Sequence, residues 1–340
     1  MSEPIVRFKN VDIVFGSEPH SALQLIDQGM RREDILKETG QTLGVAGANF
    51  DIEEGEVIVL MGLSGSGKST LLRAVNGLNP VIRGEVEVRD GDAWINPETC
   101  SPDALRHLRR HRIGMVFQQF ALLPWRTVAE NVGFGLELSG MPKAERAEKV
   151  AAQLKLVGLD GWGEKYVHEL SGGMQQRVGL ARAFATDAPI LLMDEPFSAL
   201  DPLIRDRLQD ELLDLQKELN RTIIFVSHDL DEAAKIGSRI AIMEGGRVIQ
   251  LGTPQEIVKR PATEYVADFV GHMNPLNVLR ARDIMGPVRP GGLVEAPRCA
   301  PDTPVRAVIA QKRTTQGAIL VEQNGRILGQ IGEQEIYACL

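Results

Sequence analysis

Residues 62–70 carry the clearest chemical signal in the sequence. They read Gly-Leu-Ser-Gly-Ser-Gly-Lys-Ser-Thr and fit the pattern G-x-x-x-x-G-K-S/T of a phosphate-binding loop, or P-loop. Because glycine has no Cβ, the backbone N–H groups around it can converge on phosphate oxygens. Lys68 can reach the β- and γ-phosphates of a nucleotide, and the Ser69 hydroxyl can ligate Mg²⁺. These residues predict a site for a nucleotide and its magnesium ion.

Two elements must hold this loop in place. Residues 57–61, Val-Ile-Val-Leu-Met, are apolar throughout and are typical of a buried strand. Residues 71–75 begin a helix, and the free N–H groups and partial positive charge at a helix N-terminus favour an anion. The strand–loop–helix order disfavours the alternative, a glycine-rich turn that binds nothing.

Other apolar runs also end in polar residues. Such runs end at Gln118, at the pair Asp194 and Glu195, and at His228. Strands of this kind alternate with helical segments, which predicts an α/β fold with a mostly parallel sheet. The site of such a sheet lies at the carboxyl ends of its strands. All four side chains are therefore expected near the P-loop.

Each of these side chains has a role in nucleotide hydrolysis. Asp194 can hold the Mg²⁺ that bridges the phosphates, and Glu195 can polarise the attacking water. His228 can contact the γ-phosphate region, and Gln118 can sense the Mg²⁺ or the water. Taken singly, each has a structural explanation as a strand-end carboxylate, a loop histidine or a turn glutamine. Together with the P-loop, the ordered set favours hydrolysis.

The remaining pattern predicts further elements. Residues 5–15 partly alternate and are expected to form an edge strand, and residues 21–39 to form two short helices with one apolar stripe each. Ser171 is expected to cap the start of another helix, and residues 202–219 to form one more.

The composition narrows the function classes. Of 340 residues, 43% are hydrophobic and 25% are charged, and the net charge is −8, so a broad basic surface for nucleic acid is not expected. Cys100, Cys299 and Cys339 lie far apart, which fits neither a disulfide framework nor a zinc site and suits a reducing compartment. No apolar stretch approaches the ~20 residues of a membrane span, and the N-terminus has no leader pattern. A membrane role is therefore expected to require a partner.

In this order the motifs resemble those of the nucleotide-binding subunit of ABC transporters. Residues 170–175, Leu-Ser-Gly-Gly-Met-Gln, match the family's signature and depart at Met174-Gln175 from the commonest Gln-Gln or Gln-Arg. The resemblance covers about residues 5–272. It implies a head-to-tail homodimer, in which the P-loop of one subunit and the signature of the other enclose ATP and Mg²⁺.

The resemblance also assigns residues to this site. The implied catalytic residues are Lys68, Gln118, Glu195 and His228. The implied Mg²⁺ ligands are Ser69, Gln118 and Asp194. The implied nucleotide-binding residues are Phe15, as the A-loop aromatic, with Gly62, Ser64, Gly65, Ser66, Gly67, Lys68, Ser69, Thr70, Ser171, Gly172, Gly173, Gln175 and Asp201.

The implied fold is an ABC-type P-loop NTPase over residues 1–274. It has a RecA-like core, an antiparallel β subdomain and a helical subdomain at about 119–175, with a family-specific helical insertion at about 17–45. Residues 275–340 look like one CBS-type repeat, a small α+β domain, whereas such modules normally pair two repeats.

The C-terminal segment offers too little core to be stable alone. Its helix face of Val305, Val308 and Ile309 is apolar. The two tails of the dimer are therefore expected to pair through this face.

The resemblance narrows to the ATPases of glycine betaine, proline and choline importers. Residues 22–40 and 61–69 look like that group, and residues 120–128 and 272–278 look most like its choline branch. The implied function is to power import of a quaternary amine, choline first and glycine betaine or proline betaine next. The implied partners are transmembrane permease subunits and an extracytoplasmic substrate-binding protein. The chain would then lie on the cytoplasmic face of the inner membrane.

Other functions stay open. A soluble ABC ATPase of translation or DNA repair, not coupled to transport, would resemble two fused cassettes or carry coiled-coil or zinc insertions. An exporter ATPase would lack this insertion and tail, and a P-loop kinase would leave the signature and His228 unexplained. An importer for another osmolyte or an amino acid is a further alternative, because the ATPase never touches the transported substrate.

Overall fold

The computed structural model describes residues 3–271, 273–288, 296–315 and 317–338. The chain divides into two compact units. The first unit is Met1–His228 with Ala241–Ile249, and the second is Asp229–Ile240 with Gln250–Leu340. The domain limits expected from the sequence, 1–274 and 275–340, stay predictions. His272, the first residue of one motif used for the choline branch, and Cys339 lie outside the described residues.

The larger sheet of the fold has six strands. They are β3 (Val57–Met61), β6 (Ile113–Val116), β7 (Ile190–Asp194), β8 (Thr222–Val226), β9 (Arg239–Glu244) and β10 (Arg247–Gly252). The order is β10-β9-β3-β8-β7-β6, and β3, β8, β7 and β6 run parallel to one another. Every residue of β3, β7 and β8 is buried, which explains their unbroken apolar sequences. The parallel sheet predicted from the sequence is confirmed, and it brings the ends of β3, β7 and β8 to one edge.

The second sheet is antiparallel. Its strands are β1 (Pro4–Phe15), β2 (Thr42–Glu53), β4 (Arg83–Asp90) and β5 (Ala93–Ile95), in the order β2-β1-β4-β5. Because β1 pairs with β2 on one side and β4 on the other, the expectation of an edge strand at 5–15 is wrong. Asn10 adopts a φ of +50° where the register shifts between Phe8 and Val11. Lys9 and Asn10 are exposed at this irregularity, not because β1 lies at an open edge.

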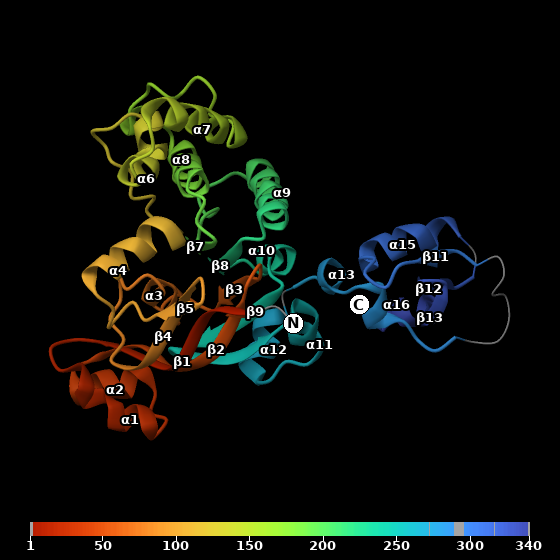
Figure 1. Cartoon of the computed structure of the whole chain (residues 1–340). Coiled ribbons are helices and arrows are strands. Elements are labelled where there is room, and N and C mark those ends of the chain that lie inside the picture. The colour runs from red at the N-terminus through yellow and green to blue at the C-terminus, as the bar shows by residue number, and fades with distance from the viewer. Residues whose placement is uncertain (1–2, 272, 289–295, 316, 339–340) are drawn as a thin grey trace. The chain divides into compact units, whose positions relative to one another are not determined.

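The helices of the first unit cover these sheets and form a separate lobe (Figure 1). They are α1 (Leu23–Asp27), α2 (Arg32–Thr39), α3 (Lys68–Ala74), α4 (Pro102–His107), α5 (Val128–Val132), α6 (Phe134–Leu138), α7 (Lys143–Leu156), α8 (Gly172–Ala185) and α9 (Pro202–Leu219). The lobe gathers α6, α7 and α8 at the top of Figure 1, while α1 and α2 lie beside the antiparallel sheet at the bottom. The two short helices expected over 21–39 are α1 and α2, and the helices expected from Ser171 and over 202–219 are also present.

The second unit holds further helices and a third sheet. Its helices are α10 (Leu230–Ile236), α11 (Pro254–Lys259), α12 (Glu264–Val270), α13 (Pro275–Val278), α14 (Ala281–Ile284), α15 (Val305–Thr314) and α16 (Glu333–Tyr337). Its sheet has the order β11-β12-β13, formed by β11 (Arg298–Cys299), β12 (Ile319–Gln323) and β13 (Arg326–Ile331).

The apolar face of α15 is covered within the chain. Val305 is fully buried, and Val308 and Ile309 pack into a core that includes Ile319 and Ile331 of the neighbouring sheet. The argument that this face needs a second tail is therefore wrong, because β12 and β13 already cover it.

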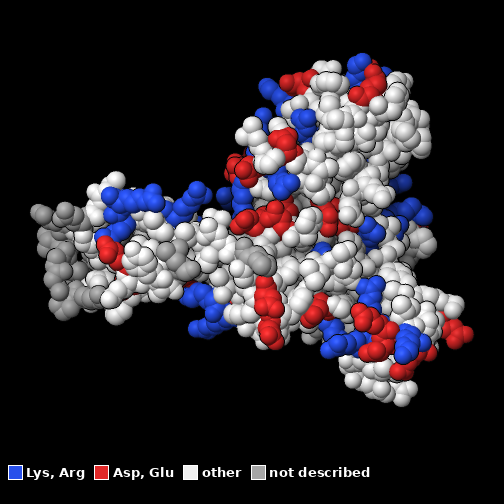
Figure 2. Space-filling model, turned by 180° about the vertical axis from the view of Figure 1, so that it is seen from behind, with Lys and Arg blue, Asp and Glu red and all other residues white. Residues whose placement is uncertain are grey.

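The surface mixes charges of both signs. On the face in Figure 2, Lys and Arg side chains alternate with Asp and Glu in small groups. Ion pairs such as Lys9 with Glu87 and Lys149 with Asp187 join charges of opposite sign. Within the described residues, no helix is both long and apolar enough to cross a membrane.

Candidate nucleotide site

The P-loop joins β3 to α3, and its glycines are required by its geometry. Gly62 has a φ of +142°, and a Cβ there would lie 2.1 Å from the carbonyl oxygen of Met243. Gly67 has a φ of +102°, and its Cβ would lie 2.4 Å from the carbonyl oxygen of Gly44. No other residue fits these two positions without displacing backbone. The loop is thus closely packed on the side away from solvent.

Lys68 lies inside the P-loop and is held by neutral oxygens. It is 6% exposed, and its Nζ donates to the carbonyl oxygens of Gly62 and Leu63 at 2.8 and 2.9 Å. Burial lowers the pKa of Lys68, and the charges of Glu195 and Asp194 oppose that shift. Among the described residues no carboxylate lies within ion-pair distance of this ammonium. A buried cation held only by neutral oxygens is incompletely compensated, so the loop fits an anion such as a nucleotide phosphate.

Asp194 ends β7 and is tied to the helix after the P-loop. Its Oδ1 accepts a hydrogen bond from the Ser69 hydroxyl at 2.6 Å, and its Oδ2 pairs with Arg73 Nη2 at 2.8 Å. Asp194 is fully buried, and such a carboxylate needs this compensation. The structure therefore brings together two of the predicted metal ligands. Sequence reasoning missed Arg73, although its spacing of four residues from Ser69 places both on one face of α3.

Glu195 connects the predicted catalytic residues. Its Oε2 accepts from Gln118 Nε2 at 3.3 Å, and its Oε1 lies 3.5 Å from Nδ1 of His228. These three side chains come from the ends of β6, β7 and β8, so the parallel sheet alone accounts for their meeting.

The backbone of Glu195 is held in an unusual conformation. Its φ is +49°, in a region that non-glycine residues rarely adopt. Its N–H donates to the carbonyl of Val226 at 3.2 Å, and its carbonyl accepts from Ser198 Oγ at 3.1 Å and Gln176 Nε2 at 3.4 Å. Strain of this kind costs about 1–3 kcal/mol and persists where neighbouring contacts impose it. Gln176, buried in α8, is a second supporting residue that sequence reasoning missed.

The signature residues are held by their own segment. Ser171 caps α8 by accepting from the N–H of Met174 at 3.4 Å. Gln175 Nε2 donates to the carbonyls of Val167 and Leu170 at 3.1 and 3.2 Å. Ser171 and Gly172 are exposed, so the start of α8 faces solvent. The hydrogen bonds found for Ser171 and Gln175 do not involve the P-loop, and nucleotide contact by this segment stays a prediction.

Other predicted nucleotide-binding residues lie around the P-loop or cap a helix. Phe15 ends β1 and is 37% exposed. Its Cε2 and the Thr70 Cγ2 would each lie 2.9 Å from a Cβ built on Gly44, so the ring borders the first turn of α3. Ser64 is exposed, whereas Ser66 is buried. Asp201 caps α9 by accepting from the N–H of Ile204 at 3.1 Å.

The loop after Gln118 is fixed to the helical lobe. Phe120 and Ala121 have φ values of +59° and +46°. Their carbonyls accept hydrogen bonds from Arg182 of α8 at 2.7 and 2.8 Å. Burial lowers the pKa of Arg182, which has no acidic partner among the described residues. Trp125, further along this loop, is 71% exposed.

Comparison with known proteins places this geometry in a family. The ABC transporter family profile matches residues 45–198. The glycine betaine transport ATP-binding protein OpuAA of Bacillus subtilis (strain 168) is 50% identical over 295 residues, which cover 87% of this chain and 70% of that protein. The chain belongs to the ATP-binding subunits of ABC transporters. It is therefore an ABC ATPase with the P-loop fold predicted from its sequence, and it couples ATP hydrolysis to transport.

Two further members of this family extend the comparison. The glycine betaine/proline betaine transport system ATP-binding protein ProV of Escherichia coli (strain K12) is 45% identical over 335 residues, which cover 98% of this chain and 82% of that protein. A solved ATP-binding cassette, dimeric in a post-hydrolysis state with ADP and Pi, superimposes with a TM-score of 0.64 and 32% identity. That comparison covers 74% of this chain and 99% of the solved one. The likeness therefore includes the whole cassette.

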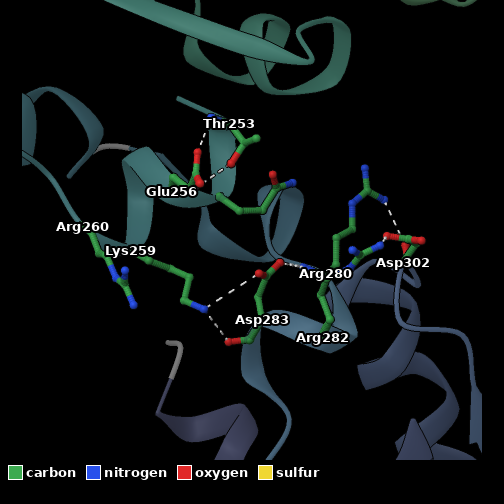
Figure 3. Close-up of a pocket in the computed structure, with 9 residues that line it drawn as sticks. Thr253, Glu256, Lys259, Arg260, Arg280, Arg282, Asp283 and Asp302 are labelled. Atoms are coloured by element: carbon green, nitrogen blue, oxygen red, sulfur yellow. Dashed lines mark hydrogen bonds and ion pairs between the residues drawn. The ribbon is translucent and has the colours of Figure 1, made fainter. Parts of the chain in front are cut away.

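A separate hollow lies within the second unit (Figure 3). Two ion pairs form between residues that line it. Arg282 pairs with Asp302, and Lys259 Nζ lies 3.8 Å from Asp283 Oδ1. Lys259 and Arg282 thus already have carboxylate partners, and none is found for Lys68 among the described residues. This difference favours the P-loop as the nucleotide site.

We expect Lys68→Ala to raise the Kd for ATP at least about tenfold, because a charge-assisted contact with phosphate is worth ~1.5–3 kcal/mol. Equilibrium binding of a fluorescent ATP analogue measures the change. Lys217→Ala, which removes an exposed lysine from α9, is the matched control and should bind like wild type. Equal affinity of both variants would contradict the role given to Lys68.

Proposed function

We propose that the chain powers import of a small quaternary amine, with glycine betaine or proline betaine as the first candidates. The observation that carries the proposal is the identity of 50% with the glycine betaine protein OpuAA. The P-loop of this chain holds a buried lysine for which the described residues offer no carboxylate partner. The choline preference expected from the sequence stays a prediction. An importer for another osmolyte or amino acid is the alternative.

The proposed Mg²⁺ ligands are Ser69 and Asp194. Their oxygens lie 2.6 Å apart at the end of β7, and hydroxyl and carboxylate oxygens are the ligands that Mg²⁺ prefers. Gln118 reaches this region through Glu195. Bound Mg²⁺ would neutralise charge on the phosphates, while Glu195 would orient a water molecule and His228 would contact the terminal phosphate.

The proposed active unit is a head-to-tail homodimer. The exposed Ser171 and Gly172 open α8, a helix of 14 residues whose free N–H groups favour an anion. Among the described residues, the hydrogen bonds of Ser171 and Gln175 stay within their own segment, and the proposal is that this helix start meets the nucleotide of a second copy. The solved relative is dimeric, which supports the same arrangement.

The proposed permease contact is the loop that contains Trp125. An indole that is 71% exposed favours a partner site, and Arg182 ties this loop to α8, the helix that begins with the signature. Through such permease subunits the chain would lie at the cytoplasmic face of the inner membrane. A substrate-binding protein outside the membrane would complete the system. The segment 275–340 is proposed to be a CBS-like module.

Glu195→Gln should form a stable ATP-bound dimer, because the amide keeps the side chain's shape but cannot accept a proton from water. Size-exclusion chromatography with light scattering, with ATP and Mg²⁺, measures the mass. Glu218→Gln on the exposed surface of α9 is the control and should hydrolyse ATP like wild type. If the Glu195 variant stays monomeric with ATP while wild type hydrolyses it, the dimer proposal is wrong.

Transport in cells that carry the permease and the substrate-binding protein tests the proposed function. We expect uptake of radiolabelled glycine betaine or proline betaine with this chain, and loss of uptake with Lys68→Ala. Labelled choline is measured beside them. In the same cells Trp125→Ala should reduce uptake while its ATPase activity in solution is retained. Uptake of an amino acid, and of none of the quaternary amines, would refute the substrate proposal.

A further inference from the structure

The insertion hairpin, residues 19–40, is a rigid part of the first unit. Gly29, with a φ of +73°, turns the chain between α1 and α2. Ile26 and Ile35 are 4% and 0% exposed and pack against the strand residue Val14. A helix held by a fully buried residue has a fixed orientation, so the side chains on its other faces also have fixed positions.

Polar contacts fix the hairpin at its other side. Arg83 at the start of β4 pairs with Asp27, with distances of 2.7 and 3.0 Å between its two terminal nitrogens and the two carboxylate oxygens. The same guanidinium pairs with the buried Asp12 of β1. Arg247 Nη2 donates to the carbonyl of Ile26 at 3.2 Å. These polar contacts attach the hairpin to β4 and β10.

Arg32 extends from the start of α2 to the P-loop. Its guanidinium donates a hydrogen bond to the carbonyl oxygen of Gly65. A Cβ built on Gly65 would lie 3.6 Å from the same nitrogen. Within the part of the chain that the structure describes, Arg32 has no carboxylate partner. The insertion therefore places an unpaired cation on the outer side of the phosphate-binding loop, whose inner side holds Lys68.

We propose that Arg32 is a positioning residue of the nucleotide site. It fixes the Gly65 peptide, and its charge strengthens the attraction of the loop for a polyphosphate. This inference rests on the proposed role of residues 62–70 in nucleotide binding. A guanidinium has five N–H donors, so one bond to Gly65 leaves others for water or phosphate. The family-specific insertion then has a defined task, which is to carry this cation.

Arg32 is expected to contribute to nucleotide binding and little to the hydrolysis step. The catalytic side chains Gln118, Glu195 and His228 contact one another, and no contact between them and Arg32 is found in the described residues. Removing Arg32 should therefore weaken nucleotide affinity and raise KM while kcat changes little. A mere folding defect would instead lower the amount of active protein and leave KM unchanged.

The test compares Arg32→Met, which removes donor and charge, with Arg32→Lys, which keeps the charge. Arg31→Met is the matched control, because it removes one charge from the exposed residue just before α2. The measurements are the Kd of MANT-ADP without Mg²⁺ over a KCl series, the KM and kcat for ATP, and the melting temperature without nucleotide.

We expect Arg32→Met to raise the Kd and KM about three- to tenfold, with kcat within about twofold of wild type. Its Kd should depend less on KCl than that of wild type, because one cation near the phosphates is lost. Arg32→Lys should recover part of the affinity, and Arg31→Met should match wild type. Equal Kd values and salt dependence for Arg32→Met and Arg31→Met would overturn the inference.

Lys68→Ala measured beside these variants separates the two proposals. If Lys68→Ala binds weakly and Arg32→Met binds like wild type, only the role of Arg32 is wrong. If Lys68→Ala also binds like wild type, the assignment of residues 62–70 as the nucleotide site is wrong.

Discussion

The buried ammonium of Lys68 is the interaction on which the rest of the site depends. The loop around it has the left-handed φ values of Gly62 and Gly67 and approaches neighbouring backbone too closely for any side chain there. Lys68 is 6% exposed, and the carbonyl oxygens of Gly62 and Leu63 compensate its charge only in part. A phosphate would supply the missing compensation. Part of the free energy of nucleotide binding would therefore come from compensating this buried charge.

The parallel sheet positions the remaining chemistry with few additional contacts. Strands β3, β7 and β8 end at one edge, so Asp194, Glu195 and His228 meet there through topology alone. The precise positions need further support. Arg73 fixes Asp194 from α3, and Gln176 reaches the carbonyl of Glu195 from α8. Because α8 also begins with the signature, the strained Glu195 is directly connected to the helix proposed to meet the partner subunit.

The sequence was most informative where chemistry constrains residue types. The P-loop, the strand-end carboxylates and the parallel sheet could all be predicted, because glycines, buried apolar runs and carboxylates have few alternative uses in that order. The interior position of β1 could not, since the bulge near Asn10 produces the same pattern as an open edge. The sequence shows that one face of α15 is apolar, but it does not show whether that face packs against its own sheet or against a second subunit. In the structure its own sheet covers it.

Supporting contacts between residues far apart in the chain could not be predicted from the sequence either. Arg73 could have been found from its helical spacing to Ser69, but nothing local links Arg32 to Gly65, which lies 33 residues away. That contact depends on how the insertion packs on β1 and β2, and packing is decided by the whole core. The sequence therefore predicted which residues do chemistry better than which residues hold them.

A crystal structure of the chain with Mn²⁺ and a non-hydrolysable ATP analogue tests the central claim most directly. Lys68 Nζ is expected to leave the carbonyls of Gly62 and Leu63 for phosphate oxygens. An anomalous Mn²⁺ signal is expected beside the oxygens of Ser69 and Asp194. If the nucleotide binds while Lys68 keeps its carbonyl partners, or if the metal lies away from Ser69 and Asp194, the account is contradicted.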